Sequence, residues 1–453
     1  MEISAIIMAA GAGTRMKSEK SKVVHEICFK PLIKWVHCAA QAAGIDKIVT
    51  VVGHKAQQVK DCLGEDKIYA TQTEQLGTGH AVMCAMPEID DDGCVIVLSG
   101  DAPLITDETL KSAIEYHNKN RLSATVITAI VDNPHGYGRI IRDEDGNVKS
   151  IVEEKDATAA QKLVTEVNSG MYCFDTGLLR AALSDIKAEN AQGEYYLTDT
   201  IEILIKNGYS VGAFTLADNE EIMGINDRMQ LAHAQSVMQK RIVRRHQANG
   251  VTVINPDHTY IGADVKIGAD TIIYPGCILE GSVSIGGGCI IGANCNIKDS
   301  TVGSGCEIIS SVITNSDIGT GVHIGPFAYI RPNCSVGDNV KVGDFVELKN
   351  SNIDSGTKIS HLTYVGDSDV GKNVNFGCGT VTVNYDSKNK HRTKIGDNCF
   401  IGCNTNLVAP VELKEGSYTA AGSTITENVP ENSLGIARSR QTNKENWVLN
   451  KEF

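Results

Sequence analysis

Aliphatic residues recur at every sixth position through much of the second half of the chain. The period covers seven consecutive positions from Ile261 to Ile297, slips by one residue at Val302 and continues, with interruptions, to Ile425. A short fixed period is typical of a solenoid, and six residues fit a short strand plus a tight corner better than a helix. A glycine after the aliphatic residue, as at Gly262, gives the corner its backbone freedom. The pattern predicts triangular coils of about 18 residues, stacked about 4.8 Å apart.

The first half of the chain, up to about residue 225, alternates short apolar runs with amphipathic segments. This alternation predicts a mainly parallel sheet with helices on both faces, in which ligands bind at the carboxyl ends of the strands. The expected strands are Ser4–Met8, Lys47–Val52, Val95–Leu98, Ala124–Ile130 and Gly170–Phe174. The expected helices are Pro31–Ala43, Gln57–Leu63, Gly79–Ala85 and Thr109–Asn118.

One amphipathic helix, from Asp227 to Asn249, is predicted between the two halves. At about 1.5 Å per residue it would be roughly 35 Å long and would hold the halves apart. The predicted organisation is a domain of residues 1–226, a helical linker of residues 227–249 and a solenoid domain of residues 250–453. Basic residues crowd the end of this helix, where cations complement the helix dipole and where phosphate binding is an alternative role. These residues are Lys240, Arg241, Arg244 and Arg245.

The chain of 453 residues carries 42 Lys and Arg against 55 Asp and Glu, which gives a net charge of −13. This balance argues against nucleic acid or an anionic membrane as a partner, so local basic clusters must hold any phosphate ligand. The N-terminal segment lacks the basic start of a signal peptide, and no apolar run reaches the roughly 18 residues of a membrane-spanning helix. We therefore expect a cytoplasmic protein.

The fourteen cysteines contain no Cys-x-x-Cys pair. Six of them stand two residues before a repeat aliphatic, at positions where a small residue fills the inside of a coil. They are Cys277, Cys289, Cys295, Cys306, Cys334 and Cys399. The spacing favours this packing role over a metal site or disulfides.

A glycine-rich turn follows the first predicted strand, in the segment from Ala9 to Met16. Such a turn lets backbone N–H groups approach phosphate oxygens, and the side chains of Arg15 and Lys22 add positive charge. Met16 stands where a dinucleotide fingerprint needs its third glycine, and the Gly-Lys-Ser/Thr of a Walker A motif is missing. Alone, the turn is compatible with phosphate binding or with an ordinary loop.

A buried strand ends at Asp101, and Pro103 follows it. A carboxylate at a strand end beside a phosphate site is a suitable Mg²⁺ ligand, because Mg²⁺ takes one or two carboxylates together with substrate oxygens and water. The alternative is an aspartate that only serves a turn.

Together these segments resemble the sugar-nucleotide pyrophosphorylases. Further matching segments are Leu76–His80, Gly136–Ile140, Asn168–Gly170, Gly193–Leu197 and Gly224–Asn226. With the six-residue repeats included, nearly the whole chain is similar to the bacterial family of bifunctional N-acetylglucosamine-1-phosphate uridyltransferases and glucosamine-1-phosphate acetyltransferases. The resemblance implies an α/β Rossmann-like nucleotidyltransferase domain followed by a left-handed parallel β-helix, although the general rule for parallel crossovers predicts a right-handed coil. It implies UTP, N-acetylglucosamine-1-phosphate, glucosamine-1-phosphate and acetyl-CoA as substrates, with Mg²⁺ as cofactor.

The resemblance also assigns roles to single residues in the first half. Arg15 and Lys22 would neutralise the triphosphate during catalysis, and Asp101 and Asn226 would bind Mg²⁺. The residues expected around UTP and its product are Met8, Ala9, Ala10, Gly11, Lys22, Gln72, Gly77, Thr78, Asp101, Gly138, Glu153, Asn168 and Asn226, of which Gly138, Glu153 and Asn168 would hold the sugar. Ser21 departs from the family, which usually has proline there. No general base is needed, because the attacking phosphate monoester is already an anion at neutral pH.

The six-residue period fails between Phe376 and Ile395, where a polar segment interrupts it. Basic residues lie close together in this segment, at Lys388, Lys390, Arg392 and Lys394. In an acidic chain, a basic loop that projects from a rigid prism favours a phosphate-bearing ligand, and a solvated surface loop is the alternative.

His361 lies upstream of this loop, two residues after the repeat aliphatic Ile359. The resemblance implies that His361 is the general base that takes a proton from the sugar amine, and an imidazole pKa of about 6.5 suits this role. The residues that would hold glucosamine-1-phosphate are Arg331, Lys349, Tyr364, Asn375 and Lys390, and those that would line the acetyl-CoA site are Cys378, Asn384, Tyr385, Cys403, Ala421 and Arg438. Cys378 and Cys403 replace the family's alanine and serine. We expect these thiols to make acetyl transfer, and not uridyl transfer, sensitive to alkylation.

The flat sides of a triangular prism pack readily against copies of themselves, and the resemblance implies a homotrimer with the acetyl site between subunits. Two other readings stay open at this point. One is a single-activity sugar-1-phosphate nucleotidyltransferase whose solenoid serves only assembly, and the other is a solenoid that is a purely structural trimerisation module. His361 and the basic loop argue against both, because assembly alone needs neither of them.

Overall fold

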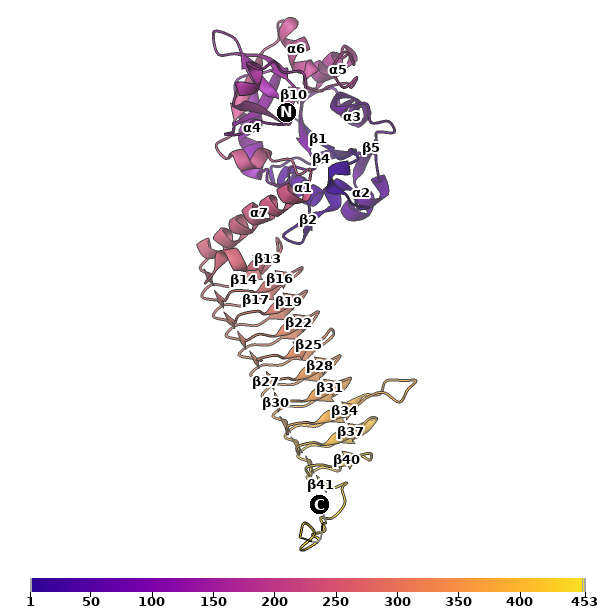
Figure 1. Cartoon of the computed structure of the whole chain (residues 1–453). Coiled ribbons are helices and arrows are strands. Elements are labelled where there is room, and N and C mark those ends of the chain that lie inside the picture. Colours follow the sequence, from indigo (N-terminus) through magenta and orange to yellow (C-terminus); the bar gives the residue numbers. More distant parts are fainter. Residues whose placement is uncertain (1, 450, 452–453) are drawn as a thin grey trace. The chain divides into compact units, whose positions relative to one another are not determined.

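The computed structural model describes residues 2–449 and residue 451 (Figure 1). The chain separates into two units, which divide between Met238 and Gln239. Helix α7 (Arg228–Ala248) contains this division, so the helix expected over residues 227–249 forms as one continuous element. Ala234 and Met238 are buried in its first part, and Ile242 is buried in its second part. In the part of the chain that the structure describes, no helix has the combination of length and apolar character that crossing a bilayer requires.

The first unit is built on a mixed sheet with the strand order β11-β7-β10-β6-β1-β4-β5. Its strands are β1 (Ile3–Met8), β4 (Lys47–Val52), β5 (Ile68–Thr71), β6 (Cys94–Ser99), β7 (Ala124–Ile130), β8 (Arg139–Arg142), β9 (Val148–Val152), β10 (Glu166–Asp175) and β11 (Val211–Thr215). Strands β1, β4, β5 and β6 are parallel, whereas β10 runs antiparallel to β6 and β7. Strands β8 and β9 extend the edge of β10, and β2 (Glu26–Ile27) pairs with β3 (Lys30–Pro31) as a separate hairpin.

Helices cover both faces of this sheet, as the sequence predicts. The helices are α1 (Leu32–Ala42), α2 (Ala56–Leu63), α3 (Thr78–Ala85), α4 (Asp107–Lys119), α5 (Thr176–Ser184) and α6 (Asp199–Lys206). The short 3-10 helices of this unit are η1 (Thr14–Met16), η2 (Lys22–Val24), η3 (Met86–Glu88), η4 (Gln161–Leu163) and η5 (Asn219–Ile222). All four expected helices form, each within two residues of its predicted ends.

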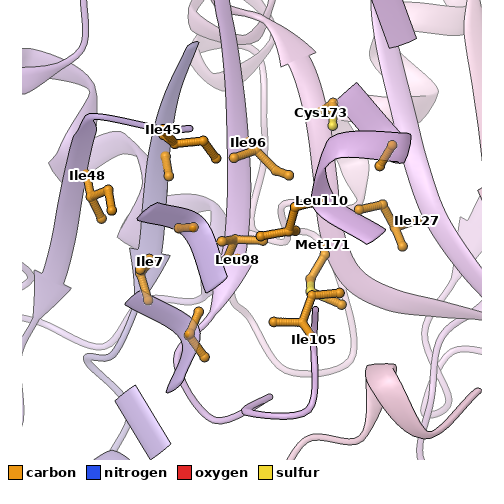
Figure 2. Packing of buried hydrophobic residues seen from close by; sticks show 14 of the residues in the cluster. Ile7, Ile45, Ile48, Ile96, Leu98, Ile105, Leu110, Ile127, Met171 and Cys173 are labelled. Carbon is orange, nitrogen blue, oxygen red and sulfur yellow. The ribbon is translucent and has the colours of Figure 1, made fainter. Parts of the chain in front are cut away.

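Alternate residues of the central strands face opposite layers of the core, because successive side chains in a strand point to opposite faces. Ile96 and Leu98 of β6 pack in the layer that holds residues of α1, α2 and α4, and Val95 and Val97 pack in the layer that holds residues of α3, α5 and α6. Figure 2 shows Leu98 beside Leu110 of α4 in the first of these layers. Burial on both faces makes β1 and β6 continuous apolar runs, which is typical of parallel strands between helices.

The second unit consists of three parallel sheets of eleven, ten and nine strands, whose strands follow one another in rotation along the chain (Figure 1). The eleven-stranded sheet comprises β12 (Thr252–Val253), β15 (Ile272–Ile273), β18 (Ile290–Ile291), β21 (Glu307–Ile308), β24 (His323–Ile324), β27 (Lys341–Asp344), β30 (Lys358–His361), β33 (Asn375–Phe376), β36 (Phe400–Ile401), β39 (Tyr418–Thr419) and β41 (Leu434–Gly435). The short helix η6 (Pro256–His258) lies between β12 and β13.

The ten-stranded sheet comprises β13 (Tyr260–Ile261), β16 (Ile278–Glu280), β19 (Asn296–Lys298), β22 (Val312–Thr314), β25 (Tyr329–Ile330), β28 (Glu347–Lys349), β31 (Tyr364–Gly366), β34 (Val381–Val383), β37 (Asn406–Val408) and β40 (Thr424–Ile425). The nine-stranded sheet comprises β14 (Lys266–Ile267), β17 (Ser284–Ile285), β20 (Thr301–Val302), β23 (Asp317–Ile318), β26 (Ser335–Val336), β29 (Asn352–Ile353), β32 (Ser368–Val370), β35 (Thr393–Ile395) and β38 (Val411–Leu413).

The repeat aliphatics form the inside of this solenoid. From Ile273 to Ile297 all five are at most 3% exposed, and only Ile267 in the first coil is partly exposed among the seven that begin at Ile261. The six repeat cysteines are also buried, which confirms their packing role, and all fourteen cysteines are free thiols. The thiol of Cys277 donates to the carbonyl of Gly292 at 3.1 Å, as the hydroxyl of Thr271 does to Gly286 at 2.8 Å. Cysteine thus serves as a small filler with a weak donor.

Candidate functional site

The loop after β1 borders a cavity of about 360 Å³ in the first unit. Strands β1 and β6 are parallel neighbours with Met8 opposite Ser99, so their carboxyl ends open on the same edge of the sheet. Of the residues expected around UTP and its product, the cavity is lined by Met8, Ala9, Ala10, Gly11, Lys22, Gln72, Gly77, Thr78 and Asp101. Ser99, Gln75 and Glu194 also line it, and sequence reasoning did not single them out.

The far wall of this cavity depends on Gly77. Its φ of +113° is a conformation that side chains rarely adopt, and a Cβ atom there would lie 2.6 Å from the carbonyl oxygen of Tyr195. The buried amide of Gln72 donates to the Gly77 carbonyl at 3.1 Å, and the hydroxyl of Thr78 accepts the N–H of Leu197 at 3.0 Å. These contacts fix the turn whose backbone faces the cavity.

A second cavity of about 340 Å³ is lined by Arg15 and Asn226 and shares Asp101 with the first. The Lys22 ammonium donates to the Asp101 carboxylate and, at 3.1 Å, to Oδ1 of Asn226. Arg15 donates to the same Oδ1 at 3.0 Å. The four residues thus converge from the short helices η1 and η2, which hold Arg15 and Lys22, and from two loops that follow much later in the chain.

The pair of Asp101 and Asn226 passes a chemical test for a divalent cation. Both supply oxygen atoms, which Mg²⁺ prefers, and both already hold one cation, the Lys22 ammonium. Among residues 2–449 and 451, no group of three or more His, Cys, Asp or Glu forms a metal centre. A site with two protein oxygens fits a cation that keeps substrate oxygens and water as its other ligands.

Ser21, the departure from the family's proline, uses the N–H that proline lacks. This N–H donates to Oε1 of Gln58 on α2 at 2.7 Å, and Nε2 of Gln58 donates to the Glu19 carbonyl at 3.2 Å. Ser21 has φ −58°, which proline also adopts, and its buried hydroxyl has no hydrogen-bond partner. Gln58 therefore clamps the loop that leads into Lys22.

The three residues expected to hold the sugar lie together. A Cβ atom on Gly138 would lie 3.4 Å from both Asn168 and the Glu153 carboxylate and 3.3 Å from Ile151, so the glycine packs closely against both of its expected partners. Burial raises the pKa of Glu153, against a weak hydrogen bond from Thr198 at 3.4 Å. The Asn168 amide donates to the hydroxyl of Tyr172 at 2.6 Å, which fixes its orientation.

In the second unit, His361 ends strand β30 beside an aspartate that sequence reasoning missed. Asp344 is the residue opposite His361 in the neighbouring strand β27, and its Oδ1 lies 2.8 Å from Nδ1 of His361. The hydrogen bond from His361 holds the pKa of Asp344 below its ordinary value. Both side chains are exposed in the single chain, His361 at 60%.

A polar cluster lies at the corner that follows the ten-stranded sheet, around the buried carboxylate of Asp367. Its oxygens accept from the amides of Asn350 and Asn384, each at 2.5 Å, and Lys349 lies 3.6 Å away. Burial acts to raise the pKa of Asp367, but the two amides and the charges of Lys349 and Lys390 outweigh it, so the pKa is below its ordinary value.

Two lysines of this cluster face each other. The pKa of Lys390 is lowered by its contact with Lys349, which places two positive charges side by side. The hydroxyl of Tyr364 lies 3.4 Å from the Asn384 amide and so borders the same cluster. Three of the five residues expected for glucosamine-1-phosphate are therefore together: Lys349, Tyr364 and Lys390.

The other expected residues of this site lie on neighbouring coils. The Arg331 N–H donates to the Leu348 carbonyl, next to Lys349, and its guanidinium pairs with Glu347 at 2.8 Å. Asn375 lies on β33, the strand beside β30. Backbone hydrogen bonds connect the corners of successive coils: the N–H groups of Gly379, Asn404 and Gly422 donate to the carbonyls of His361, Cys378 and Cys403. The acetyl-CoA candidates Cys378, Cys403 and Ala421 therefore occupy one column of corners. Arg438 lies near the end of this column, 3.9 Å from where a Cβ on Gly422 would be.

The basic loop after β34 projects from the coils (Figure 1). Not all of its cations are available for a ligand. Arg392 is bound to Asp369, with 2.9 Å and 2.5 Å contacts, and to the carbonyl of Ser368 at 2.9 Å, so it anchors the loop. Tyr385 is exposed, and its hydroxyl donates to the Ser387 carbonyl at 2.7 Å. Arg392 is therefore excluded as a ligand-binding cation, and Lys390 with the residues around it stays the candidate phosphate site of this loop.

Comparison with known proteins agrees with one candidate site in the first unit and another in the second. The nucleotidyl transferase family model matches residues 4–260, and the bacterial transferase hexapeptide model, of six repeats, matches residues 315–350 and 392–427. Over 447 residues the chain is 56% identical to the bifunctional protein GlmU of Caldanaerobacter subterraneus, which covers 99% of this chain and 98% of the relative.

Two further relatives carry the same name. The GlmU of Acetivibrio thermocellus is 56% identical over 450 residues, and that of Clostridioides difficile is 52% identical over 451 residues, with 98% of each relative covered. The hexapeptide match together with the three parallel sheets confirms the left-handed parallel β-helix over the right-handed coil of the general rule. The chain therefore belongs to the bifunctional GlmU family, with a nucleotidyl transferase part followed by a hexapeptide-repeat part.

Proposed function

We propose that the chain is a bifunctional enzyme that makes UDP-N-acetylglucosamine in two steps. The solenoid transfers an acetyl group from acetyl-CoA to the amine of glucosamine-1-phosphate. The first unit then transfers UMP from UTP to the N-acetylglucosamine-1-phosphate and releases pyrophosphate. In functional terms, we assign the first reaction to residues 250–453, the second to residues 1–226 and a linking role to residues 227–249.

The observation that carries the proposal is the contact between Lys349 and Lys390 above Asp367. Two facing ammonium groups repel each other, and an assembly surface gains nothing from them. A phosphate monoester, which carries close to two negative charges at neutral pH, would bind both through charge-assisted hydrogen bonds. This cluster therefore favours two activities over a nucleotidyltransferase whose solenoid only assembles.

In the first unit, the residues around the two cavities are arranged to align an anionic nucleophile and to stabilise the negative charge of the phosphates. The backbone after β1 and the cation of Lys22 line the first cavity, where the triphosphate would bind, and the cation of Arg15 lines the second cavity beside it. Asp101 and Asn226 would hold Mg²⁺, which neutralises charge on the phosphate oxygens during phosphoryl transfer. Lys22, which donates to both of these side chains, would neutralise phosphate charge beside them. Glu153, Asn168 and Gly138, which lie together, would select the sugar.

In the second unit, His361 is the candidate general base. Its Nδ1 is held by Asp344, so Nε2 is the nitrogen available to take a proton from the sugar amine as the amine attacks the thioester carbon. Lys349 and Lys390 would fix the phosphate of the same substrate. The column of corners with Cys378, Cys403 and Ala421 would carry the acetyl-CoA, and Asn384 and Tyr385 would border it from the adjoining loop.

We also propose that the chain works as a homotrimer. Phe327 and Phe345 stack on successive corners with ring centroids 5.6 Å apart, yet they are 60% and 58% exposed, and Leu362 on the next corner is 57% exposed. Such an apolar ridge is costly in water and fits burial against a second copy. The ridge adjoins Asp344 and His361 in sequence, which supports an acetyl site between subunits. UTP and acetyl-CoA are cytoplasmic metabolites, so we place the enzyme in the cytoplasm.

A product assay tests the proposal. The protein is incubated with Mg²⁺, acetyl-CoA, glucosamine-1-phosphate and each nucleoside triphosphate in turn, and the products are separated by mass. We expect UDP-N-acetylglucosamine with UTP, and N-acetylglucosamine-1-phosphate when UTP is left out. A protein that uses N-acetylglucosamine-1-phosphate but never acetylates glucosamine-1-phosphate would establish the single-activity alternative.

A further inference from the structure

The contact between His361 and Asp344 determines which nitrogen of the imidazole carries a proton. The pKa of Asp344 lies below its ordinary value, so the carboxylate is ionised at neutral pH and can only accept a hydrogen bond. The ring nitrogen 2.8 Å away, Nδ1, must therefore be the protonated one in the neutral ring. Nε2 is then left with a free lone pair, which is the state that a general base needs.

The backbone fixes both partners. They are register neighbours in parallel strands, and the N–H of Leu362 donates to the Asp344 carbonyl at 3.0 Å. The hydroxyl of Thr363 donates to the His361 carbonyl at 2.7 Å. The pair is therefore set by the coil geometry and not by the chance meeting of two mobile side chains.

A stabilising role does not account for the pair. Exposed ion pairs contribute little to stability, and the side chains of Asp344 and His361 are 39% and 60% exposed in the single chain. Removal of the carboxylate should therefore leave the fold intact, so that its effect on the reaction can be measured.

We propose that Asp344 is a positioning residue for acetyl transfer, holding His361 in the tautomer and orientation in which Nε2 faces the sugar amine. The proposal rests on the acetyltransferase function proposed above. Asp344 itself contacts no substrate in this scheme, and it acts through His361. Two titratable residues flank His361. Asp344 lies in the preceding coil, and Cys378 lies in the following coil, in the turn whose backbone donates to the His361 carbonyl. Lys358 lies on the same strand as His361.

The same sheet offers a matched control. His323 and Glu307 are also register neighbours in adjacent strands, with Nδ1 and Oε2 3.1 Å apart and side chains 60% and 41% exposed. This pair has the chemistry and exposure of the first pair but lies outside the proposed site. Glu307→Ala therefore measures what the loss of an exposed carboxylate beside a histidine does to the solenoid in general.

The experiment compares Asp344→Ala, Asp344→Asn and Glu307→Ala in the full chain. We expect Asp344→Ala to lower kcat of acetyl transfer at least tenfold with little change in the KM of glucosamine-1-phosphate, since orientation of a general base is lost. Asp344→Asn keeps an oxygen acceptor for Nδ1–H and should recover most of kcat.

A substrate-free measurement separates this proposal from the acetyltransferase assignment. Diethylpyrocarbonate modifies neutral imidazole, and peptide mass spectrometry reports its rate at His361 and at His323. At a pH where imidazole is neutral, the rate of His361 modification should fall in Asp344→Ala, because the tautomer with a free Nε2 is no longer fixed, and it should recover in Asp344→Asn and stay unchanged in Glu307→Ala. An unchanged modification rate of His361 in Asp344→Ala, equal losses of kcat in Asp344→Ala and Glu307→Ala, or no recovery of kcat in Asp344→Asn would overturn the proposal. A wild-type protein with no acetyl transfer, whose variants nevertheless show the expected modification rates of His361, would instead overturn the proposed function.

Discussion

The two units build their sites by different means. In the first unit, Lys22 at the start of η2 meets Asp101 and Asn226, which lie in loops far from it in the sequence, at one edge of a sheet. In the second, Asp344 meets His361 because the residues are opposite each other in adjacent strands, one coil apart. A loop site can move its members independently, whereas a coil site inherits its geometry from the register of the solenoid.

This difference determines what each site can tolerate. The loop site depends on single backbone positions, such as Gly77, and on clamps, such as Gln58, that hold the loops in place. The coil site depends on side-chain identity, because its backbone repeats regardless of what each corner carries. Substitutions should therefore damage the first site through conformation and the second through lost charge or acceptor groups.

The largest effect is expected at Gly77. Gly77→Ala combines an unfavourable φ with a contact of 2.6 Å to a backbone oxygen, so the turn must move and uridyl transfer should fall at least about a hundredfold. Acetyl transfer should be unchanged. Gly193→Ala is the control, because Gly193 also has a positive φ, of +66°, but a Cβ there meets nothing within 4 Å. The rates of uridyl transfer and acetyl transfer are measured in both variants. Equal losses of uridyl transfer in Gly77→Ala and Gly193→Ala would contradict the steric explanation.

In the coil site, Lys390→Ala should raise the KM of glucosamine-1-phosphate roughly tenfold to a hundredfold, the value of one hydrogen bond between charged groups. Uridyl transfer should not change. Lys388→Ala, on the same loop but outside the cluster, is the matched control and should have no effect. If Lys388→Ala were as damaging as Lys390→Ala, the loop would act through general charge and not through the cluster.

Alkylation should also separate the two sites. An alkylated thiol would block the column of corners, so acetyl transfer should fall about tenfold. Cys403 is exposed and Cys378 is half-buried, and both lie in that column, whereas the six repeat cysteines are buried. Iodoacetamide should inactivate acetyl transfer before uridyl transfer, and a Cys378→Ala/Cys403→Ser protein should resist it. The assignment fails if the doubly substituted protein is inactivated at the wild-type rate.

A smaller effect concerns pH in the loop site. Because burial raises the pKa of Glu153, this carboxyl takes up a proton at a higher pH than an exposed glutamate does. As the pH falls, its ability to accept hydrogen bonds from sugar hydroxyls is lost first, so the KM of N-acetylglucosamine-1-phosphate should rise a few-fold under mildly acidic conditions. Glu153→Gln should have a high KM that no longer varies over this range. A wild-type KM that is flat with pH would exclude this role.

Sequence patterns predicted the two folds well, because both depend on periodicity. The six-residue repeat places aliphatics inside every coil, and the alternation of apolar runs and amphipathic segments gives β1, β4, β6, β7 and helices α1 to α4. The antiparallel direction of β10 was not predictable, since an apolar run looks the same in either direction. Helices α5 and α6 were also not predicted.

Asp344 and Asp367 could not be predicted as site residues from the sequence. Asp344 and Asp367 each follow a Val-Gly pair, as do Asp338 and, after Ile-Gly, Asp397. The latter two accept backbone N–H groups at corners, at 2.7 Å and 2.8 Å. The same local motif therefore occurs both where the aspartate only stabilises a corner and where it belongs to a candidate site. Only the stacking of coils shows which aspartate contacts His361 or Lys349.

The claim that two independent sites occupy one chain is tested most directly by crossing two variants with two assays. Asp101→Ala should lower uridyl transfer about a hundredfold or more and leave acetyl transfer at the wild-type rate, because it removes electrostatic stabilisation in the first unit only. His361→Ala should do the reverse, and a mixture of the two proteins should again convert glucosamine-1-phosphate to UDP-N-acetylglucosamine. A folded variant that loses both activities, or a mixture that stops at glucosamine-1-phosphate, would contradict the account.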